Sequence, residues 1–304
     1  MTVLTGDPHR WQLPEGARAH VAIGVFDGVH RGHQSVLADV RAASAADDPV
    51  VALTFDPHPL EIVAPEHAPK LLGTVDQRVE WLRAEGVDVV GVLPFDRIRE
   101  WSAQAFIDVL LVRALRARVV AVGRDFRFGY DRRGDLATLA AEGAFEVHAV
   151  DLLGEGAGPI SSSVIRRRLV DGDVMAAAEL LGRPHAVRGP VVRGDGRGRT
   201  IGVPTANLGV HPRIQLPANG VYAARLHLAD EPFPAVVNVG VRPTFDGAHT
   251  TVEAHVLDAD LDLYGRTVDV AFVDRLRDER RFDGVEALVA QIHADVAAAR
   301  ERLA

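Results

Sequence analysis

The stretch Gly24-Val25-Phe26-Asp27-Gly28-Val29-His30-Arg31-Gly32-His33 decides the fold of the first half of the chain. Residues 20–23, an apolar run typical of a buried strand, come directly before this stretch. In residues 34–40, directly after it, apolar residues recur with the spacing of a helix. Its glycines permit a tight turn, and the first amides of the following helix favour an anion in front of them. His30 and His33 lie three residues apart and are expected on one face of that helix. We therefore predict a phosphate site at the helix start; the alternative is a glycine turn with two surface histidines.

The same stretch resembles the G-x-F-D-G-x-H-x-G-H signature of the nucleotidyltransferase superfamily. The resemblance implies that His30 and His33 stabilise the α-phosphate of a nucleotide during its transfer. It also marks four residues of the turn as nucleotide-binding candidates: Gly24, Phe26, Asp27 and Gly28. Because pantetheine-phosphate and glycerol-phosphate nucleotidyltransferases share the histidine pattern, the motif leaves the substrate open.

The composition limits the classes of protein to be considered. The chain has 304 residues, 47% of them hydrophobic, which is enough to bury a sizeable core and to form two domains. Its formal net charge of -8 argues against a general nucleic-acid binder, which needs many clustered cations. Residues 1–16 contain no apolar signal-peptide core, and no later run reaches the roughly 20 apolar residues that span a bilayer. We therefore expect a cytoplasmic protein that binds neither membranes nor nucleic acid.

Two residue counts narrow the chemistry. The chain has no cysteine, which excludes disulfides, thiolate catalysis and cysteine-ligated zinc. Lys70 is the only lysine, so a Walker-type phosphate loop of the form G-x-x-x-x-G-K-[ST] is also excluded. Bound ATP therefore has to be held by backbone amides, arginine, histidine and a metal ion.

Up to about Leu181, strand-like apolar runs alternate with helical stretches. The expected strands are residues 20–23, 50–55, 87–93, 119–122 and 145–150. The expected helices are residues 34–40, 76–85, 102–115 and 136–142. This alternation predicts an α/β fold with a mainly parallel, Rossmann-like sheet that is covered on both faces and binds ligands at the carboxyl ends of its strands.

Two further loops follow predicted strands and are expected over the same sheet edge. Phe55-Asp56-Pro57-His58-Pro59 ends one strand. The alternative to a functional loop is that Pro57 and Pro59 simply terminate the strand and that His58 is an exposed residue without a function. Gly123-Arg124-Asp125-Phe126-Arg127-Phe128-Gly129 ends another, and two phenylalanines around an arginine suit the wall of a site for a planar, anionic ligand.

A serine-rich segment, Ile160-Ser161-Ser162-Ser163-Val164-Ile165-Arg166, begins another predicted helix. Serine hydroxyls and Arg166 at a helix start are suited to bind a departing pyrophosphate. The alternative is an ordinary serine-capped helix with a solvated basic face.

After Gly182-Arg183-Pro184, short strand-like runs separated by glycine and proline turns replace the alternation. The expected strands are residues 186–192, 220–228, 235–239, 251–257 and 268–273, followed by a helix at about 284–303. They predict a small β-barrel with a terminal helix, and a boundary between a domain of residues 1–183 and a domain of residues 184–304.

A second phosphate site is predicted where a loop rich in glycine and arginine joins Pro204-Thr205-Ala206-Asn207. Its phosphate-binding candidates are Gly194, Gly198, Arg199 and Gly202. Thr205 and Asn207 alternate along an extended chain and so point two oxygen ligands the same way, toward Mg²⁺. The alternative is an ordinary surface loop.

Glu253 is the one carboxylate in the run 250–257. We expect it to face the inside of the barrel, with Val252 and Ala254 on the opposite face. A carboxylate held in this way can deprotonate a hydroxyl group for attack on a γ-phosphate. The alternative is an outward-facing glutamate of a strand.

Nearly the whole chain resembles the prokaryotic bifunctional riboflavin kinase/FAD synthetase family. The first half matches through the histidine stretch and residues 54–59, 123–129 and 160–166. The second half matches through the G-x-x-x-G-R-x-x-G-x-P-T-A-N pattern at 194–207, residues 238–245, and Glu253 with His255.

The resemblance implies two ATP-dependent reactions. The second domain would convert riboflavin to FMN, with Glu253 as base and Mg²⁺ at Thr205 and Asn207. The first would adenylylate FMN to FAD, and pyrophosphate would leave toward the serine segment. The nucleotide-binding residues implied in the first half, besides the turn, are Asp125, Ser161, Ser162, Ser163 and Arg166. The flavin-binding residues implied are Phe55, Pro57, Phe126, Phe128, Arg242, Thr244 and Arg277.

Two departures and two alternatives accompany this resemblance. Many members carry asparagine where Val25 stands and threonine where Ser163 stands, and the second change keeps the hydroxyl. One alternative is an FAD synthetase whose barrel is a catalytically silent, flavin-binding regulatory module. The other is a nucleic-acid-binding barrel, which the acidic net charge and the 6% aromatic content disfavour. The oligomeric state is left open.

Overall fold

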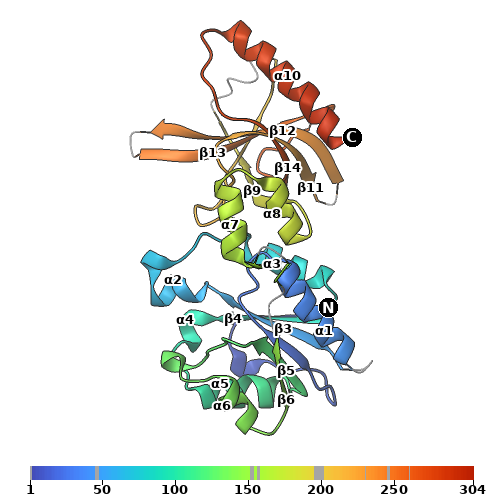
Figure 1. The fold of residues 1–304 in the computed structure, drawn as a ribbon, viewed down its shortest axis with the longest axis vertical. Coiled ribbons are helices and arrows are strands. Elements are labelled where there is room, and N and C mark those ends of the chain that lie inside the picture. Colours follow the sequence, from blue (N-terminus) through green and yellow to red (C-terminus); the bar gives the residue numbers. More distant parts are fainter. Residues whose placement is uncertain are drawn as a thin grey trace. The chain divides into compact units, whose positions relative to one another are not determined.

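The computed structural model describes residues 2–44, 48–150, 154–155, 158–194, 202–229, 231–244, 247–259 and 261–304. The chain forms two compact units (Figure 1). The first unit comprises Met1–Pro69 and Val75–Ser161, and the second comprises Lys70–Thr74 and Ser162–Ala304. The segment Lys70–Thr74 thus belongs to the second unit although sequence of the first unit flanks it on both sides.

A six-stranded parallel sheet forms the centre of the first unit. The strand order is β1-β4-β3-β2-β5-β6, and all neighbouring strands are parallel. The strands are β1 (Thr2–Leu4), β2 (His20–Ile23), β3 (Val50–Asp56), β4 (Val89–Pro94), β5 (Val119–Gly123) and β6 (Glu146–Val150). This confirms the predicted Rossmann-like sheet. The loops after β2, β3 and β5 leave the carboxyl ends of three adjacent strands, so they share one edge of the sheet.

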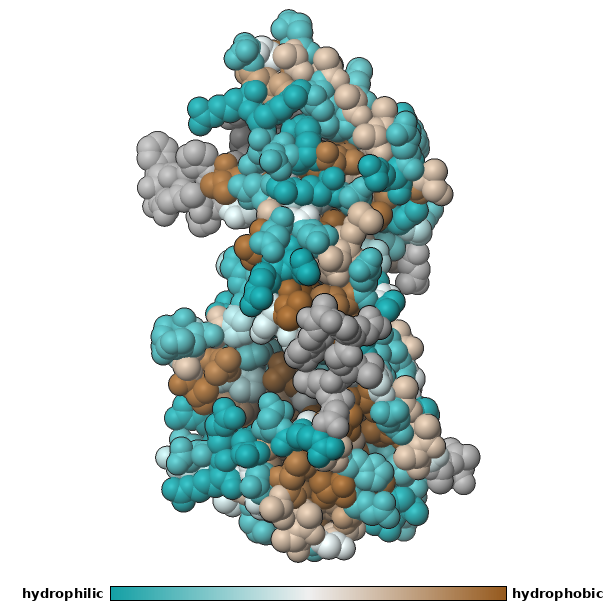
Figure 2. Space-filling model, viewed as in Figure 1, coloured by the Kyte–Doolittle hydropathy of each residue, from teal (hydrophilic) through white to brown (hydrophobic). Residues whose placement is uncertain are grey.

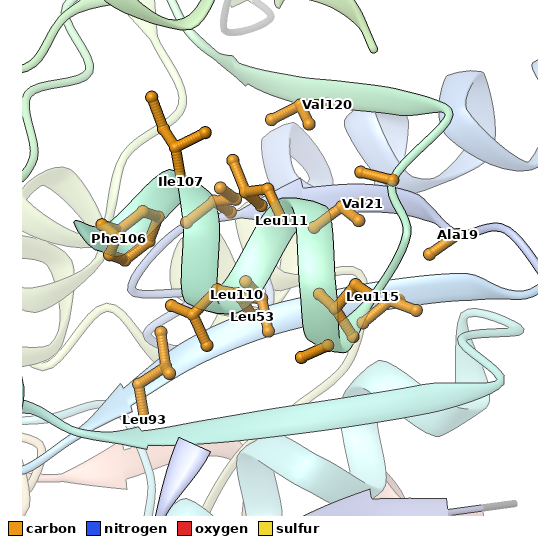
Figure 3. Packing of buried hydrophobic residues seen from close by; sticks show 14 of the residues in the cluster. Ala19, Val21, Leu53, Leu93, Phe106, Ile107, Leu110, Leu111, Leu115 and Val120 are labelled. Atoms are coloured by element: carbon orange, nitrogen blue, oxygen red, sulfur yellow. The ribbon is translucent and has the colours of Figure 1, made fainter. Parts of the chain in front are cut away.

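Helices cover both faces of this sheet. In β2, Val21 joins one hydrophobic cluster and Ala22 joins the other, because successive strand residues point to opposite faces. The π-helical segment η3 (Ile107–Ala114) packs into the first cluster, where Leu111 lies near Val21 (Figure 3). The second cluster receives α1 (Arg31–Ala43).

The remaining elements of the first unit are short. They are η1 (Pro8–Arg10), α2 (Pro59–Val63), η2 (Pro65–His67), α3 (Val75–Ala84), α4 (Phe95–Ile98), α5 (Ala103–Phe106), η4 (Tyr130–Arg132), α6 (Leu136–Ala141), β7 (Gly154–Glu155) and β8 (Gly158–Pro159). The single helix predicted over residues 102–115 is therefore divided, with four α-helical residues in α5 before the chain continues as η3.

The second unit is built on a closed antiparallel barrel with a C-terminal helix, as predicted. The strand order is β10-β13-β12-β11-β14-β9. The strands are β9 (His185–Val192), β10 (Ala206–Leu208), β11 (Gly220–Leu228), β12 (Glu231–Thr244), β13 (Gly247–Val256) and β14 (Thr267–Arg277). The short strand β10 was not predicted; it pairs with both β9 and β13 and so closes the barrel.

Two helices before the barrel belong to its core. Ile165 and Leu169 of α7 (Ser162–Val170) and Leu181 of α8 (Val174–Leu181) share one buried cluster with barrel residues and with Leu72. The compact unit therefore starts at Ser162, ahead of the predicted domain boundary at residues 183 and 184, because both helices bury apolar side chains with the barrel.

The terminal helix α10 (Val285–Leu303) packs outside the barrel, where Ala299 and Leu303 meet Val221 and Val236. On the face shown in Figure 2, hydrophilic and hydrophobic residues are interspersed in both units. No helix within the described ranges is both long enough and apolar enough to cross a lipid bilayer.

Candidate active sites

The predicted turn between β2 and α1 has an unusual backbone. Phe26 has φ of +52° and Val29 has φ of +38°, with Gly28 at +79° between them. The turn is closed by the Val29 amide, which donates to the Phe26 carbonyl at 3.0 Å. Left-handed conformations at non-glycine residues cost about 1–3 kcal/mol each and are concentrated at functional sites. The intrinsic backbone preferences of Phe26 and Val29 therefore oppose this turn, and the surrounding structure has to stabilise it.

The structure brings His30 and His33 together at the start of α1. Their rings are stacked with centroids 3.7 Å apart and an interplanar angle of 17°. The rings of Phe26 and His33 pack edge to face with their centroids 5.1 Å apart. Gly32 lies between the histidines in sequence, and a Cβ there would come within 3.2 Å of the His30 ring. A glycine at 32 therefore lets the ring lie over the first turn of the helix.

Burial controls the protonation of His33. It holds the pKa of His33 well below its usual range, and the electrostatic effects of the neighbouring His30 and Arg78 act in the same direction. His33 is therefore neutral at pH 7, and a neutral imidazole still has one N–H to donate. Its buried Nδ1 has no hydrogen-bond partner among the described residues.

The other residues of the turn are mostly inaccessible. Phe26 and Asp27 are each 2% exposed. Phe26 folds back over Gly24, where a Cβ would lie 3.4 Å from its ring, and it packs in a hydrophobic cluster of the sheet. The nucleotide contacts of Gly24, Phe26, Asp27 and Gly28 stay predictions.

Behind the turn lies a hydrogen-bonded chain that sequence reasoning missed. The Arg78 guanidinium donates from Nη1 to Thr54 Oγ1 at 3.0 Å, and Thr54 Oγ1 donates to the Val25 carbonyl at 2.8 Å. Arg78 sits in an otherwise ordinary amphipathic helix, so its pattern in the sequence is that of a solvated arginine. Only the fold shows that it is buried.

In the loop after β3, two of the predicted residues, Phe55 and His58, are buried and have roles in packing and helix capping. Phe55 is 8% exposed and packs in the core, where its ring meets Phe95 at 5.9 Å. His58 is 8% exposed, so it is buried rather than exposed, and its Nδ1 accepts a hydrogen bond from the Leu60 amide at 3.1 Å that caps α2. Pro57 is half-buried. The flavin contacts of Phe55 and Pro57 remain predictions.

The two phenylalanines of the loop after β5 differ in their surroundings. Their rings are stacked with centroids 5.5 Å apart. Phe128 is 6% exposed and packs in the core, whereas Phe126 is half-buried and Asp125 is exposed. Phe126 and Asp125 are thus the more accessible candidates in this loop.

The serine–arginine segment is divided between the two units. Ser161 ends the first unit, whereas Ser162, Ser163 and Arg166 belong to α7 in the second. Arg166 is tied within the second unit, where its Nε donates to the Lys70 carbonyl. The predicted binding of pyrophosphate by this segment stays a prediction.

In the second unit, Glu253 stands in a row of polar residues across three strands. It lies opposite Asn207 of β10 and opposite Asn238 of β12. Residues opposite each other in a sheet project to the same face. Val252 and Ala254, each 1% exposed, belong to the cluster inside the barrel. The predicted inward orientation of Glu253 is therefore wrong: the alternation places its neighbours in the core and Glu253 on the outer wall.

Two cavities flank the segment before β10. One, of about 330 Å³, lies between the outer wall and α10 and is lined by Glu253, Asn238 and His255 with apolar residues such as Phe282 and Ile292. The other, of about 450 Å³, is lined by Ala206, Tyr264 and their neighbours. Thr205 lines both cavities.

Close packing fixes Asn207 and the chain before it. A Cβ at Gly194 would come within 2.3 Å of the Asn207 side-chain amide, so a larger residue there would force the Asn207 side chain to shift. His255 Nδ1 lies 2.8 Å from the Pro204 carbonyl, to which it donates. Gly202 has φ of +77°, a conformation that suits glycine. Gly198 and Arg199 lie outside the described residues.

Arg277 lines the smaller cavity but is engaged by α10. Its guanidinium binds the Asp295 carboxylate through Nε at 2.9 Å and Nη2 at 2.8 Å. Phe282 lies 5.8 Å from the guanidinium carbon. The backbone of Arg242 and Thr244 belongs to β12, and their side chains lie outside what the structure describes. The flavin contacts of these three residues stay predictions.

Comparison with known families divides the chain in two. The Flavokinase family model, described as riboflavin kinase, matches residues 181–303. The FAD_syn family model, described as FAD synthetase, matches residues 13–164.

Whole-length relatives agree with this division. The bifunctional riboflavin kinase/FMN adenylyltransferase of Escherichia coli K12 is 42% identical over 99% of this chain and 97% of its own length. The protein of the same name from Bacillus subtilis is 33% identical over 97% of this chain and 95% of its own. A crystal structure described as a macrolide-efflux protein from Streptococcus pneumoniae is similar with a TM-score of 0.87 and 34% identity over 98% of both chains.

Proposed function

The chain belongs to the family of bifunctional riboflavin kinases/FMN adenylyltransferases, and from this premise we propose that each of its compact units carries one of the two reactions. The enzyme phosphorylates riboflavin with ATP to give FMN and ADP. It then transfers the adenylyl group of a second ATP to FMN, which gives FAD and pyrophosphate.

In the kinase reaction, Glu253 is the general base. Its carboxylate accepts the proton of the terminal riboflavin hydroxyl while that oxygen attacks the γ-phosphorus and ADP leaves. Glu253 and apolar walls line the cavity of about 330 Å³, which suits the planar flavin. The cavity of about 450 Å³ then takes ATP, and Thr205, which lines both, stands where the phosphates meet the acceptor.

The donor set at Thr205 and Asn207 fits Mg²⁺. A hydroxyl and an amide oxygen are hard ligands, and Mg²⁺ is usually held by few protein groups together with substrate phosphates. Among the described residues, no three histidine, aspartate or glutamate side chains gather into a metal-holding cluster. A Mg²⁺ ion held there together with ATP would neutralise phosphate charge. Gly194, Gly198, Arg199 and Gly202 belong to the same proposed phosphate-binding loop.

In the adenylyl transfer, His30 and His33 act on the α-phosphate. An FMN phosphate oxygen attacks the α-phosphorus, the bond to the β-phosphate oxygen breaks, and no covalent enzyme intermediate is needed. His33 is neutral at pH 7 and donates an N–H to an oxygen of the transferring group. Asp125 and Phe126 supply nucleotide and flavin contacts, and Ser161, at the end of the first unit, contacts the departing pyrophosphate.

The proposed functional boundary at residues 183 and 184 separates α7 and α8 from the kinase reaction, although both helices pack in the core of the second unit. The proposed location of the enzyme is the cytoplasm. The observation that carries the division of labour is that the stacked histidines and the Glu253 row belong to different compact units.

Two single variants of the full chain test this division. His30→Ala is expected to abolish FAD formation while riboflavin is still converted to FMN. Glu253→Gln is expected to lower riboflavin phosphorylation by roughly 10²–10⁴-fold while supplied FMN is still converted to FAD. Products are separated by chromatography. Loss of both products in either folded variant contradicts the division.

A further inference from the structure

Arg78 is a buried arginine to which neither reaction has yet been assigned a use. It is 1% exposed and heads the set of largest fully buried side chains among the described residues. Burying a guanidinium is costly unless it is paired, so its position needs a physical reason.

The contacts of Arg78 lead directly to the histidine turn. Nη1 donates to Thr54 Oγ1 at 3.0 Å and to the Phe55 carbonyl at 2.9 Å. Thr54 is fully buried, and its hydroxyl donates to the Val25 carbonyl at 2.8 Å, which extends the hydrogen-bonded chain to the turn. Val25 immediately precedes the left-handed residue Phe26. One guanidinium on α3 thus anchors the backbone where the strained turn begins.

The charge of Arg78 also acts on the turn. Burial lowers the pKa of Arg78, and the carboxylate of Asp27, which is 2% exposed, opposes that shift. A buried carboxylate at a phosphate site repels the substrate unless a cation balances it. Arg78 supplies that cation, and the same charge helps to keep His33 neutral.

The pairing of Arg78 is incomplete. Its buried Nε has no hydrogen-bond acceptor among the described residues. An unsatisfied buried N–H is unfavourable for stability, so a residue selected only to hold the fold together is not expected to keep it.

We propose that Arg78 is a positioning residue for adenylyl transfer: through Thr54 it fixes the turn that presents His30 and His33, and its charge balances Asp27. This rests on the proposed assignment of adenylyl transfer to the first unit. If that assignment fails, His30→Ala leaves FAD formation intact; if only the present inference fails, His30→Ala abolishes it and the Arg78 variants do not reduce it.

The test uses the full chain and measures both activities in each variant. Arg78→Met is expected to lower kcat for FAD formation from FMN roughly 100-fold, the size of effect that a misplaced reacting group produces, with little change in KM. Arg83→Met is the matched control, because Arg83 is an exposed arginine on the same helix. Riboflavin phosphorylation by the same molecules is expected to be unchanged and reports that the chain is folded.

Thr54 variants keep the proposal testable if Arg78→Met does not fold. Thr54→Val removes the hydroxyl link at nearly constant volume, and we expect roughly a tenfold loss of kcat for FAD formation. Thr54→Ser, which keeps the hydroxyl, should restore most of it. Normal FAD formation by folded Arg78→Met or by Thr54→Val overturns the proposal, as does a Thr54→Ser variant no better than Thr54→Val.

A purely structural role is separated by titration of His33. The groups whose electrostatic effects lower the pKa of His33 are His30, at the start of α1, and Arg78, from α3. Arg78→Met removes the guanidinium charge, so the pKa of His33 should rise. An unchanged His33 titration by NMR contradicts the charge role.

Discussion

His30 and His33 hold their rings 3.7 Å apart, a separation that two imidazolium ions would strongly oppose. Burial resolves the conflict by keeping His33 neutral. At the scale of single residues, burial therefore lets the two rings stack closely while the neutral His33 ring keeps one N–H to donate to a phosphate oxygen. His185 in the second unit shows the same physics without a catalytic purpose. It is 1% exposed, and its Nε2 donates to the Gln215 carbonyl at 2.8 Å.

His185 is expected to make the second unit sensitive to acid. Burial lowers its pKa to about 4, below the value near 6.5 of an unfolded histidine. As the pH falls below 6.5, His185 is protonated in the unfolded chain but not in the folded one. The free energy of unfolding is therefore highest above pH 6.5 and decreases between pH 6.5 and about pH 4. Between pH 7 and 5 the loss is about 2 kcal/mol.

Native-state hydrogen exchange of β11 amides, corrected for the intrinsic rate, measures this loss. His185→Gln keeps an N–H donor and should show a smaller loss over the same interval. Equal acid sensitivity of both proteins contradicts this explanation.

At the scale of elements, a largely buried ion pair helps to fix α10 to the outer wall of the barrel. Arg277 at the end of β14 and Asp295 in α10 are 20% and 5% exposed at their side chains. Gln291 adds a hydrogen bond to Asp295 at 2.7 Å. Because Leu288 and Ile292 of the same helix line the cavity of Glu253, the position of α10 determines the width of that cavity.

Asp295→Ala is expected to loosen α10 and raise the KM for riboflavin, with a smaller effect on kcat. It leaves the largely buried Arg277 without its carboxylate, at a cost of about 2–4 kcal/mol. Asp258→Ala is the matched control, because it breaks an ion pair with Arg300 of the same helix. The side chains of Arg300 and Asp258 are 54% and 62% exposed, so losing this pair costs little. Steady-state kinetics of FMN formation measure the KM for riboflavin in both variants. An unchanged KM in Asp295→Ala contradicts the claim that the position of α10 determines the width of the cavity.

Elements with strong periodicity were predictable from the sequence, whereas positions set by tertiary packing were not. The β2-turn-α1 unit carries its own glycines and apolar spacing, so its fold and its histidine pair could be predicted. The facing direction of Glu253 could not, because Thr251 to Val256 alternates apolar and polar residues without showing which face meets the core. Arg78 was missed for a related reason: an arginine in a helix is usually solvated, and only the neighbouring strand β3 buries it.

At the scale of the whole molecule, the chain passes between its units at residues 69 and 70, 74 and 75, and 161 and 162. The segment Lys70–Thr74 is built into the second unit. The Leu71 amide donates to the Arg213 carbonyl at 2.7 Å, the Gln215 amide donates to the Leu71 carbonyl at 2.8 Å, and Leu72 is fully buried in the core. Part of the core of the second unit is thus encoded within the sequence of the first.

Leu72→Ala is expected to destabilise the second unit by about 2–5 kcal/mol, the usual cost of truncating a buried leucine. Neither a fragment of residues 184–304 nor one of residues 162–304 contains Leu72, but only the longer one keeps α7 and α8, so the shorter fragment should unfold at a lower temperature. Thermal unfolding of the two fragments and of the full-length variant measures both effects. Equal midpoints for the fragments contradict the packing described for α7 and α8.

The assignment of one reaction to each unit is tested most directly by mixing two full-length variants, each of which lacks one of the two activities. His30→Ala alone should stop at FMN, and Glu253→Gln alone should accumulate neither FMN nor FAD from riboflavin. Mixed with riboflavin, ATP and Mg²⁺, they should form FAD, because FMN released by the first variant is adenylylated by the second. If the mixture forms no FAD although His30→Ala makes FMN, the assignment of one reaction to each unit is contradicted.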